Sequence, residues 1–294
     1  MKTFDTNHRT LSKKEAKLVM ELEWNGKQII SLDEIQKALG VGDGYSRFLA
    51  HRLVQKGWFE RLRSGVFQFI PAERGPEAIG DTNPFLEESA FRQPIFYSFG
   101  SACSYYGFTD QVFAEMYAAS TTRHSPLEMR GKKYVLAFTP KQRFYGFGEA
   151  RVLERNVPMA LPERAVLDAL DRPQYAGGLS EVSRIIGKAG SKIDFARLLE
   201  FARRWKQSAL VQRLGFFLDL HQITLPAEFW GQLKELIRPN SKIYLAPRGR
   251  WKAEGRLNRE WQVVENISRD LLLEENKNRH RFVSKTKRSG KASE

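Results

Sequence analysis

The sequence predicts a mixed α/β (α+β) protein in which a small helical domain ending in a hairpin precedes a larger domain of strands and helices. Apolar residues recur at helical spacing through the first 55 residues. From Pro94 onward, short apolar and aromatic runs alternate with helical stretches. A polar, Pro- and Gly-containing stretch separates the two patterns, and 294 residues with 41% hydrophobic content suffice for two cores.

The first elements follow from local signals. Residues 12–24 have the apolar spacing of one amphipathic helix. Ser31 is a suitable cap for a second, short helix whose Leu32, Ile35 and Leu39 share one face. Gly40 directly follows the last of these positions, which indicates that the helix ends there.

A third helix begins a few residues after Gly40. Leu49 and Leu53 lie four residues apart and face the core, which leaves Arg47, His51 and Gln55 on the opposite side. Residues 59–63 and 66–70 then flank Ser64-Gly65, a pattern typical of a hairpin with a basic tip.

Helices and a hairpin in this order are typical of a winged helix-turn-helix, occupying residues 1–71. Basic and base-reading side chains gather on one helix and the adjoining turn, which favours DNA as the partner. The candidate contacts are Arg47, His51, Arg52, Arg61 and Arg63. A domain of this size also serves as a protein-docking module, and that alternative stays open.

The rest of the chain divides by composition. We predict a linker over 72–93, a mixed α/β domain with a helical section over 94–275, and a disordered tail over 276–294. In the α/β domain we expect strands at 95–98, 116–121, 134–138, 144–147, 151–153, 242–245 and 261–264, and helices at 100–106, from 162, through 179–221 and from 226.

Charge and cysteine content limit the partners and the compartment. The formal net charge of +14 favours a polyanion and predicts salt-sensitive nucleic-acid binding. In the tail, residues 277–294 carry 7 Lys/Arg against 1 Asp/Glu, a net +6. A single cysteine, Cys103, forms no intrachain disulfide, and no signal peptide or membrane span is evident, so we expect a cytoplasmic protein.

The catalytic motifs that we sought have simpler explanations. The five histidines lack metal-ligand spacing, and Gly100-Ser-Ala-Cys103 lacks the second glycine of a nucleophile elbow. The Glu-x-Lys elements of a nuclease occur only at Glu15 and Glu275, outside the central domain. Asp168 and Asp171 near Glu163 fit structural or capping roles better. We therefore expect no enzyme activity, no metal and no cofactor.

The layout as a whole resembles the AbiEi family, the antitoxin and transcriptional repressor component of bacterial AbiE type IV toxin–antitoxin systems, which act in abortive infection and phage defence. The resemblance covers roughly residues 12–265. It is carried by segments in the expected order: 53–67, Tyr97-Ser-Phe-Gly-Ser-Ala102 to Tyr106-Gly107, Leu161-Pro-Glu-Arg-Ala-Val-Leu-Asp168, and Arg250-Trp-Lys to Glu260-Trp-Gln-Val263.

The resemblance implies a winged helix that binds inverted repeats in its own promoter and a carboxy-terminal domain that counteracts a nucleotidyltransferase-like toxin, with no stable complex required. DNA contacts would fall on Tyr45, Ser46, Arg47, His51 and Arg52 in the helix and on Arg61, Arg63 and Ser64 in the wing. The basic loop with Arg248, Arg250, Lys252 and Arg256 is a candidate contact for RNA or a partner. The long basic tail departs from the family pattern.

Two other functions remain alternatives. A winged-helix repressor whose α/β domain senses a small molecule would release DNA when its ligand binds. A DNA-targeted nuclease would cleave in the presence of a metal ion.

Overall fold

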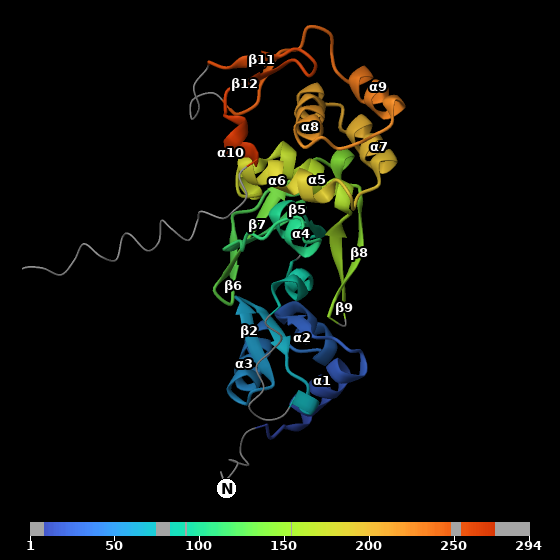
Figure 1. The fold of residues 1–294 in the computed structure, drawn as a ribbon. Helices are drawn as coiled ribbons and strands as arrows, with labels where there is room; N and C mark the ends of the chain where they lie inside the picture. Colours follow the sequence, from blue (N-terminus) through green and yellow to red (C-terminus); the bar gives the residue numbers. More distant parts are fainter. Residues whose placement is uncertain (1–8, 75–82, 92, 154, 248–253, 274–294) are drawn as a thin grey trace, which may run out of the picture. The chain divides into compact units, whose positions relative to one another are not determined.

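The computed structural model describes residues 9–74, 83–91, 93–153, 155–247 and 254–273 (Figure 1). It is a mixed α+β structure, as the sequence predicts. The chain forms two compact units. Unit 1 contains Met1–Phe96, Ala114–Thr139 and Glu149–Pro158, and unit 2 contains Tyr97–Phe113, Pro140–Gly148 and Met159–Glu294.

Unit 1 begins with the predicted winged helix-turn-helix. Three helices accompany a small antiparallel sheet in which the third strand lies between the first and second. The elements are α1 (Lys13–Trp24), β1 (Ile29–Ser31), α2 (Leu32–Leu39), α3 (Asp43–Gln55), β2 (Phe59–Arg63) and β3 (Val66–Phe69).

A mixed six-stranded sheet has the order β6-β7-β5-β4-β9-β8. Strand β5 is parallel to β7, β4 is parallel to β9, and β6 is antiparallel to β7. The strands are β4 (Ile95–Tyr97), β5 (Glu115–Ser120), β6 (Leu127–Met129), β7 (Lys132–Phe138), β8 (Phe147–Val152) and β9 (Arg155–Ala160).

A tight turn of this sheet holds the winged helix within unit 1. Arg130 and Gly131 join β6 to β7 and both have positive φ angles, 49° and 70°, as a two-residue hairpin of the type I′ kind requires. The Arg130 guanidinium donates to the Glu60 carboxylate at 2.8 Å and to the Gln68 side chain. Side-chain hydrogen bonds therefore connect the β6–β7 turn to the wing strands β2 and β3.

Two further arginines strengthen the same attachment. Arg63 donates to the Ala90 carbonyl at 2.6 Å, and Arg155 donates to the Gln28 side chain and the Leu86 carbonyl, each at 3.2 Å. Hydrogen bonds of this charged kind are stronger than neutral ones. The winged helix is thus integrated into unit 1.

The predicted linker contains an ordered segment. Residues Pro84–Ala90 form a short 3-10 helix, and Leu86 is buried. The Tyr134 hydroxyl donates to the Glu87 carboxylate at 2.7 Å. The domain borders at residues 71 and 94 stay a prediction from the sequence. The two compact units of the structure have other borders.

Unit 2 is mainly helical, and α5 is its central helix. Eight of the ten residues of α5 are buried. Helices α4, α6, α7 and α8 all pack against it. The helices are α4 (Phe99–Tyr105), α5 (Pro162–Asp171), α6 (Leu179–Ala189), α7 (Phe195–Trp205), α8 (Ser208–Leu220), α9 (Ala227–Glu235) and α10 (Arg269–Leu273).

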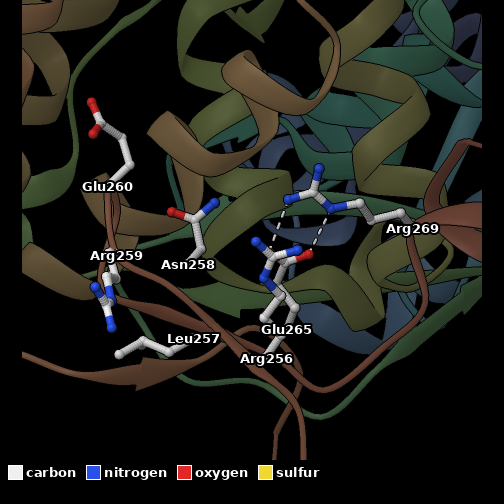
Figure 2. Close-up of a pocket in the computed structure, with 7 residues that line it drawn as sticks. All are labelled: Arg256, Leu257, Asn258, Arg259, Glu260, Glu265 and Arg269. Atoms are coloured by element: carbon white, nitrogen blue, oxygen red, sulfur yellow. Dashed lines mark hydrogen bonds and ion pairs between the residues drawn. The ribbon is translucent and has the colours of Figure 1, made fainter.

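A small second sheet completes unit 2. Strand β12 (Val263–Glu265) lies between parallel β10 (Ile243–Tyr244) and antiparallel β11 (Arg256–Asn258). Beside β11 lies a hollow of about 700 Å³ lined by Arg256, Arg259 and Arg269 together with Glu260 and Glu265 (Figure 2). Three arginines against two glutamates leave this surface weakly positive.

Several predicted elements are corrected. The expected strand over 144–147 is wrong: a 3-10 turn (Lys141–Arg143) comes first and β8 begins only at Phe147. Strands β6, β9 and β11 were not predicted. Two of them have only three residues, too short for a clear alternation of apolar and polar positions. Within the described residues, no helix is both long and apolar enough to span a bilayer.

Candidate nucleic-acid interface

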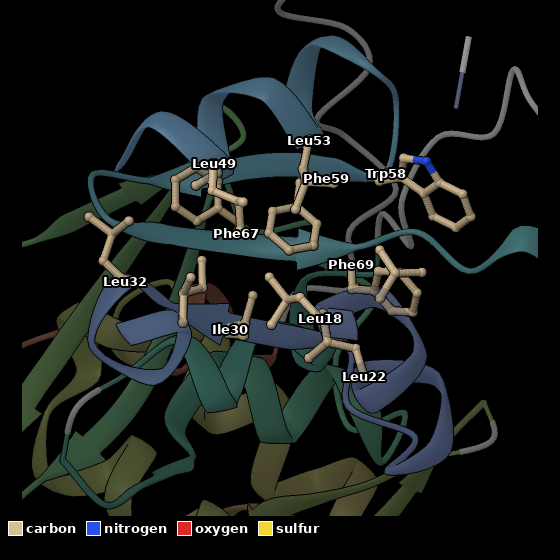
Figure 3. Packing of buried hydrophobic residues seen from close by; sticks show 13 residues of the cluster. Leu18, Leu22, Ile30, Leu32, Leu49, Leu53, Trp58, Phe59, Phe67 and Phe69 are labelled. Carbon is tan, nitrogen blue, oxygen red and sulfur yellow. The ribbon is translucent and has the colours of Figure 1, made fainter. Parts of the chain in front are cut away.

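One apolar core fixes the winged helix. Leu18 and Leu22 of α1 pack with Leu49 and Leu53 of α3 over the aromatic side chains of the small sheet (Figure 3). Trp58 and Phe69 stack at 6.3 Å between ring centroids with an interplanar angle of 3°. The buried side of α3 is therefore set by packing, and its other side faces solvent.

Local signals in the sequence set both ends of α2, the helix before α3. In α2 the Ser31 amide donates to the Glu34 carboxylate at 2.8 Å, while the Glu34 amide donates to the Ser31 hydroxyl at 3.3 Å. This reciprocal pair is a capping box. Gly40 ends α2 at φ 63°, a left-handed conformation that glycine adopts without strain.

Three predicted contact residues lie on the exposed side of α3. Tyr45, Arg47 and His51 are all exposed. Arg47 forms an ion pair with Asp43 one turn earlier, with Nε 2.8 Å from the carboxylate oxygen. That hydrogen bond raises the pKa of Arg47, so the guanidinium stays charged. The Tyr45 ring lies beneath the Lys14 ammonium at 4.7 Å.

Two other predicted residues of α3 are placed differently. Ser46 is fully buried, and its hydroxyl donates to the Asp43 carbonyl at 2.8 Å. Its placement on the contact face is therefore corrected, because it belongs to the packed side of the helix. Arg52 is half-exposed and forms an ion pair with the buried Glu15, with Nε 3.2 Å from the carboxylate oxygen.

Glu15 itself has a structural function. Burial raises its pKa, but hydrogen bonds from Lys56 and Ser12 outweigh this and leave the pKa below its ordinary value. The Lys56 ammonium lies 2.6 Å from its carboxylate. The Glu15 carboxylate therefore links α1 to the carboxy-terminal part of α3 through Arg52 and Lys56. Among the described residues, no group of three potential metal ligands occurs.

The wing provides fewer free cations than predicted. Arg61 and Ser64 are exposed, and the Arg61 guanidinium has no hydrogen-bond or ion-pair partner among the described residues. Arg63 instead points to the Ala90 carbonyl. A bulge between Arg61 and Arg63 shifts the register, so Phe59 and Leu62 are both buried and the simple alternation of faces is broken.

Sequence reasoning missed one exposed residue at the middle of this face. Phe48 is 53% exposed, while the buried residues of α3 are Ser46, Leu49, Ala50 and Leu53. Helical spacing places Phe48 next to His51 on the side opposite the core. The signal was available, because Phe48 does not fit the spacing of Leu49 and Leu53.

The second candidate surface is only partly described. Arg256 is exposed at the hollow beside β11, where Arg259 and Arg269 also lie. Arg269 forms a two-point ion pair with Glu265 at 2.7 and 2.9 Å. Arg248, Arg250 and Lys252 lie outside the described residues.

The side chains considered for catalysis are engaged in packing. Asp168 pairs with the buried Arg164, and Glu163 accepts a hydrogen bond from the Asp194 amide at 2.8 Å. Asp171 lies 3.6 Å from Arg172. Cys103 is buried, and burial, aided by the charge of Asp168, raises the pKa of its thiol above the ordinary value.

These features define a winged helix-turn-helix protein with a larger α+β region. The sequence model of the family described as "Transcriptional regulator, AbiEi antitoxin" matches residues 17–70. Residues 17–70 are therefore similar to this AbiEi antitoxin family of transcriptional regulators. The match coincides with the winged helix.

The fold is similar to one solved structure over nearly its whole length. The crystal structure of the RV2827C protein from Mycobacterium tuberculosis has a TM-score of 0.63 and 15% sequence identity, covering 90% of this chain and 96% of that one. At this identity the similarity concerns the fold alone. No curated protein matches the sequence significantly.

Proposed function

We propose that this protein is the antitoxin of a type IV toxin–antitoxin system and represses its own operon by binding promoter DNA through its winged helix. Its counterpart is a nucleotidyltransferase-like toxin, counteracted with no stable complex required. The antitoxin itself has no catalytic activity. The family match to an antitoxin and transcriptional regulator supports this proposal.

One observation carries the DNA-binding part. The solvent side of α3 presents Tyr45 and Arg47 in the amino-terminal half of the helix and His51 one turn after Arg47. In helix-turn-helix proteins the amino-terminal residues of this helix contact base edges in the major groove. Arg61 and Ser64 at the wing then contact the phosphate backbone. Arg52 and Arg63 add positive charge near the DNA. Arg52 stays paired with Glu15, and Arg63 keeps its hydrogen bond to the Ala90 carbonyl.

The antitoxin part is assigned to the larger α+β region. Its basic surface at Arg256, beside Arg259 and Arg269, is our candidate contact for neutralisation. Arg256 and Arg259 are exposed at the edge of the hollow, so their guanidinium groups are accessible to an anionic partner.

Arg47→Ala tests the DNA-binding part. We expect affinity for the promoter site to fall about 10- to 100-fold with little change on random DNA, because a two-point contact to guanine discriminates by roughly that factor. Footprinting and fluorescence anisotropy on the DNA upstream of the gene, at about 150 mM salt, measure both affinities.

Arg203→Ala is the matched control. It removes the same charge from an exposed position on α7 in unit 2. We expect it to leave promoter affinity close to that of the wild type. Equal loss on promoter and random DNA in Arg47→Ala would make Arg47 a phosphate contact. A footprint without sequence boundaries for the wild type would contradict the repressor proposal.

Co-expression tests the antitoxin part separately. The wild type is expected to restore growth of cells that express the neighbouring nucleotidyltransferase-like toxin, and Arg47→Ala is expected to restore it equally while no longer repressing the promoter. Failure of the wild type to restore growth would contradict the antitoxin proposal and leave the DNA result standing.

A further inference from the structure

Phe48 is an apolar ring at the centre of an otherwise polar and basic helix face. It is 53% exposed and lies outside the 13 buried residues of the winged-helix core. Arg52 lies over one side of the ring, with its guanidinium carbon 5.6 Å from the centroid. Tyr45 lies beside it, 6.0 Å between centroids. The apolar core therefore does not account for an aromatic side chain at this position.

In the part of the chain that the structure describes, no side chain covers the helix surface next to Phe48 at the position of Gly44. Gly44 lies one helical turn earlier, and a Cβ at Gly44 would meet nothing within 4 Å. Its φ angle is not among the positive ones, so the backbone does not require glycine. A glycine in the first turn of a helix costs stability relative to alanine. Its lack of a side chain lets an external group approach the Phe48 ring closely.

We propose that Phe48 determines specificity by contacting the 5-methyl group of a thymine in the major groove, with Gly44 providing the space for that base pair. This proposal rests on the proposed function, because it requires α3 to enter duplex DNA. The thymine methyl is the only apolar group that a base pair presents in the major groove, and phenylalanine is among the side chains that contact it. Arg47 and His51 flank the ring and reach hydrogen-bonding base edges on either side.

The geometry favours a duplex over a single strand. Proteins that bind single strands stack successive bases on aromatic rings. The Tyr45 and Phe48 rings are tilted by 46° to each other, and Lys14 and Arg52 each lie over one of them. Two consecutive stacked bases do not fit on rings so inclined. Contact of one methyl group with the open part of the Phe48 ring needs no such alignment.

The experiment replaces each thymine of the footprinted promoter site by uracil, which lacks only the methyl group, and measures the affinity of the full-length protein. For the wild type we expect one position in each half-site to lose affinity about fourfold, the equivalent of one buried methyl group. For Phe48→Ala the thymine duplex is already weakened, and the same uracil substitution causes no further loss. Phe48→Leu, which keeps an apolar contact, should retain part of the effect.

Gly44→Ala is the second variant. We expect it to lower affinity for the promoter site and leave binding to random DNA unchanged, since the added methyl occupies the approach. Thermal melting of Phe48→Ala should match the wild type, because the ring is outside the core.

The outcomes separate the inference from the function on which it rests. A sharp footprint with uracil tolerated at every position, or with equal uracil effects in the wild type and Phe48→Ala, would overturn the inference alone. Absence of any sharp footprint would overturn the proposed function. Tighter binding of single-stranded than of duplex promoter DNA, lost in Phe48→Ala, would overturn the thymine contact in favour of stacking.

Discussion

Replacing Asp168 by asparagine is expected to lower the free energy of unfolding by about 3–5 kcal/mol, the range seen when one partner of a buried ion pair is removed. Asp168 and Arg164 are 3% and 0% exposed. Two hydrogen bonds join them, from Nε at 2.8 Å and from a terminal nitrogen at 3.0 Å. The amide would leave the Arg164 charge buried without its counterion.

The surroundings of the pair explain why it does not simply relax. The remaining terminal nitrogen of Arg164 donates to the Arg143 and Tyr145 carbonyls at 2.6 and 2.8 Å. The Ser98 hydroxyl donates to Asp168 at 2.6 Å. These bonds hold the guanidinium 4.6 Å from the Trp205 ring. Urea denaturation followed by tryptophan fluorescence and circular dichroism measures the change.

Glu200→Gln is the matched control, because it makes the same carboxylate-to-amide change in another pair of residues one helical turn apart. Glu200 lies 3.7 Å from Arg204, and the two side chains are 60% and 50% exposed. We expect a loss below about 1 kcal/mol. Equal losses in the two variants would contradict the central structural function assigned to the Asp168 pair.

Gly215→Ala is expected to destabilise unit 2 by about 3 kcal/mol, the upper part of the range for overpacked cores. A Cβ at Gly215 would overlap the ring of Trp261, which is 1% exposed. That ring cannot move aside freely, because Trp230 packs on it at 5.6 Å between centroids. The backbone carbonyl of Trp261 also accepts a hydrogen bond from Gln212 on α8 at 3.2 Å.

Gly231→Ala, on α9, separates overlap from helix propensity. A Cβ there meets nothing within 4 Å. The better helix propensity of alanine should raise the free energy of unfolding by up to about 1 kcal/mol. The two substitutions are thus expected to have opposite signs in urea denaturation. A neutral result for Gly215→Ala would mean that α8 and Trp261 are less tightly packed than the structure indicates.

The winged helix was predictable because its signals are local. The capping box at Ser31 and Glu34 and the glycine at position 40 lie within ten residues of one another, and each specifies a helix end by its own chemistry. The apolar spacing at Leu49 and Leu53 fixed the buried side of α3 in the same way.

The side-chain partners that the residue pattern did not reveal at this site depend mostly on contacts distant in the chain. Arg63 is a basic residue in the wing and was therefore a candidate DNA contact. Its hydrogen-bond partner in the structure, the Ala90 carbonyl, lies 27 residues away in the sequence. The bulge that follows Arg61 leaves no mark in the residue pattern. Ser46 was misplaced for a simpler reason: a small polar residue can satisfy its hydroxyl on its own helix and be buried.

For the larger region, the sequence predicted the mixed α+β fold class but only some of the individual elements and contacts. The structural interpretation of Asp168 agrees with the structure, yet its partner Arg164 was not foreseen as a buried cation. A fully buried arginine requires backbone carbonyls at Arg143 and Tyr145, which only the tertiary fold supplies. Pair spacing along one helix does not reveal those acceptors.

The hydrogen bonds from Arg130 to Glu60 and Gln68 limit the ways in which such a regulator can acquire a new operator. Cutting the chain after residue 71 and grafting another DNA-binding domain would remove the hydrogen bonds that Arg63 donates to Ala90, Arg130 to Glu60 and Arg155 to Gln28. Arg130 would then lack the Glu60 carboxylate. Exchange of whole modules is therefore a costly evolutionary route for this architecture. Point changes on the solvent side of α3 leave every one of these attachments intact, so divergence of DNA sequence preference among such proteins is expected to proceed there, one side chain at a time.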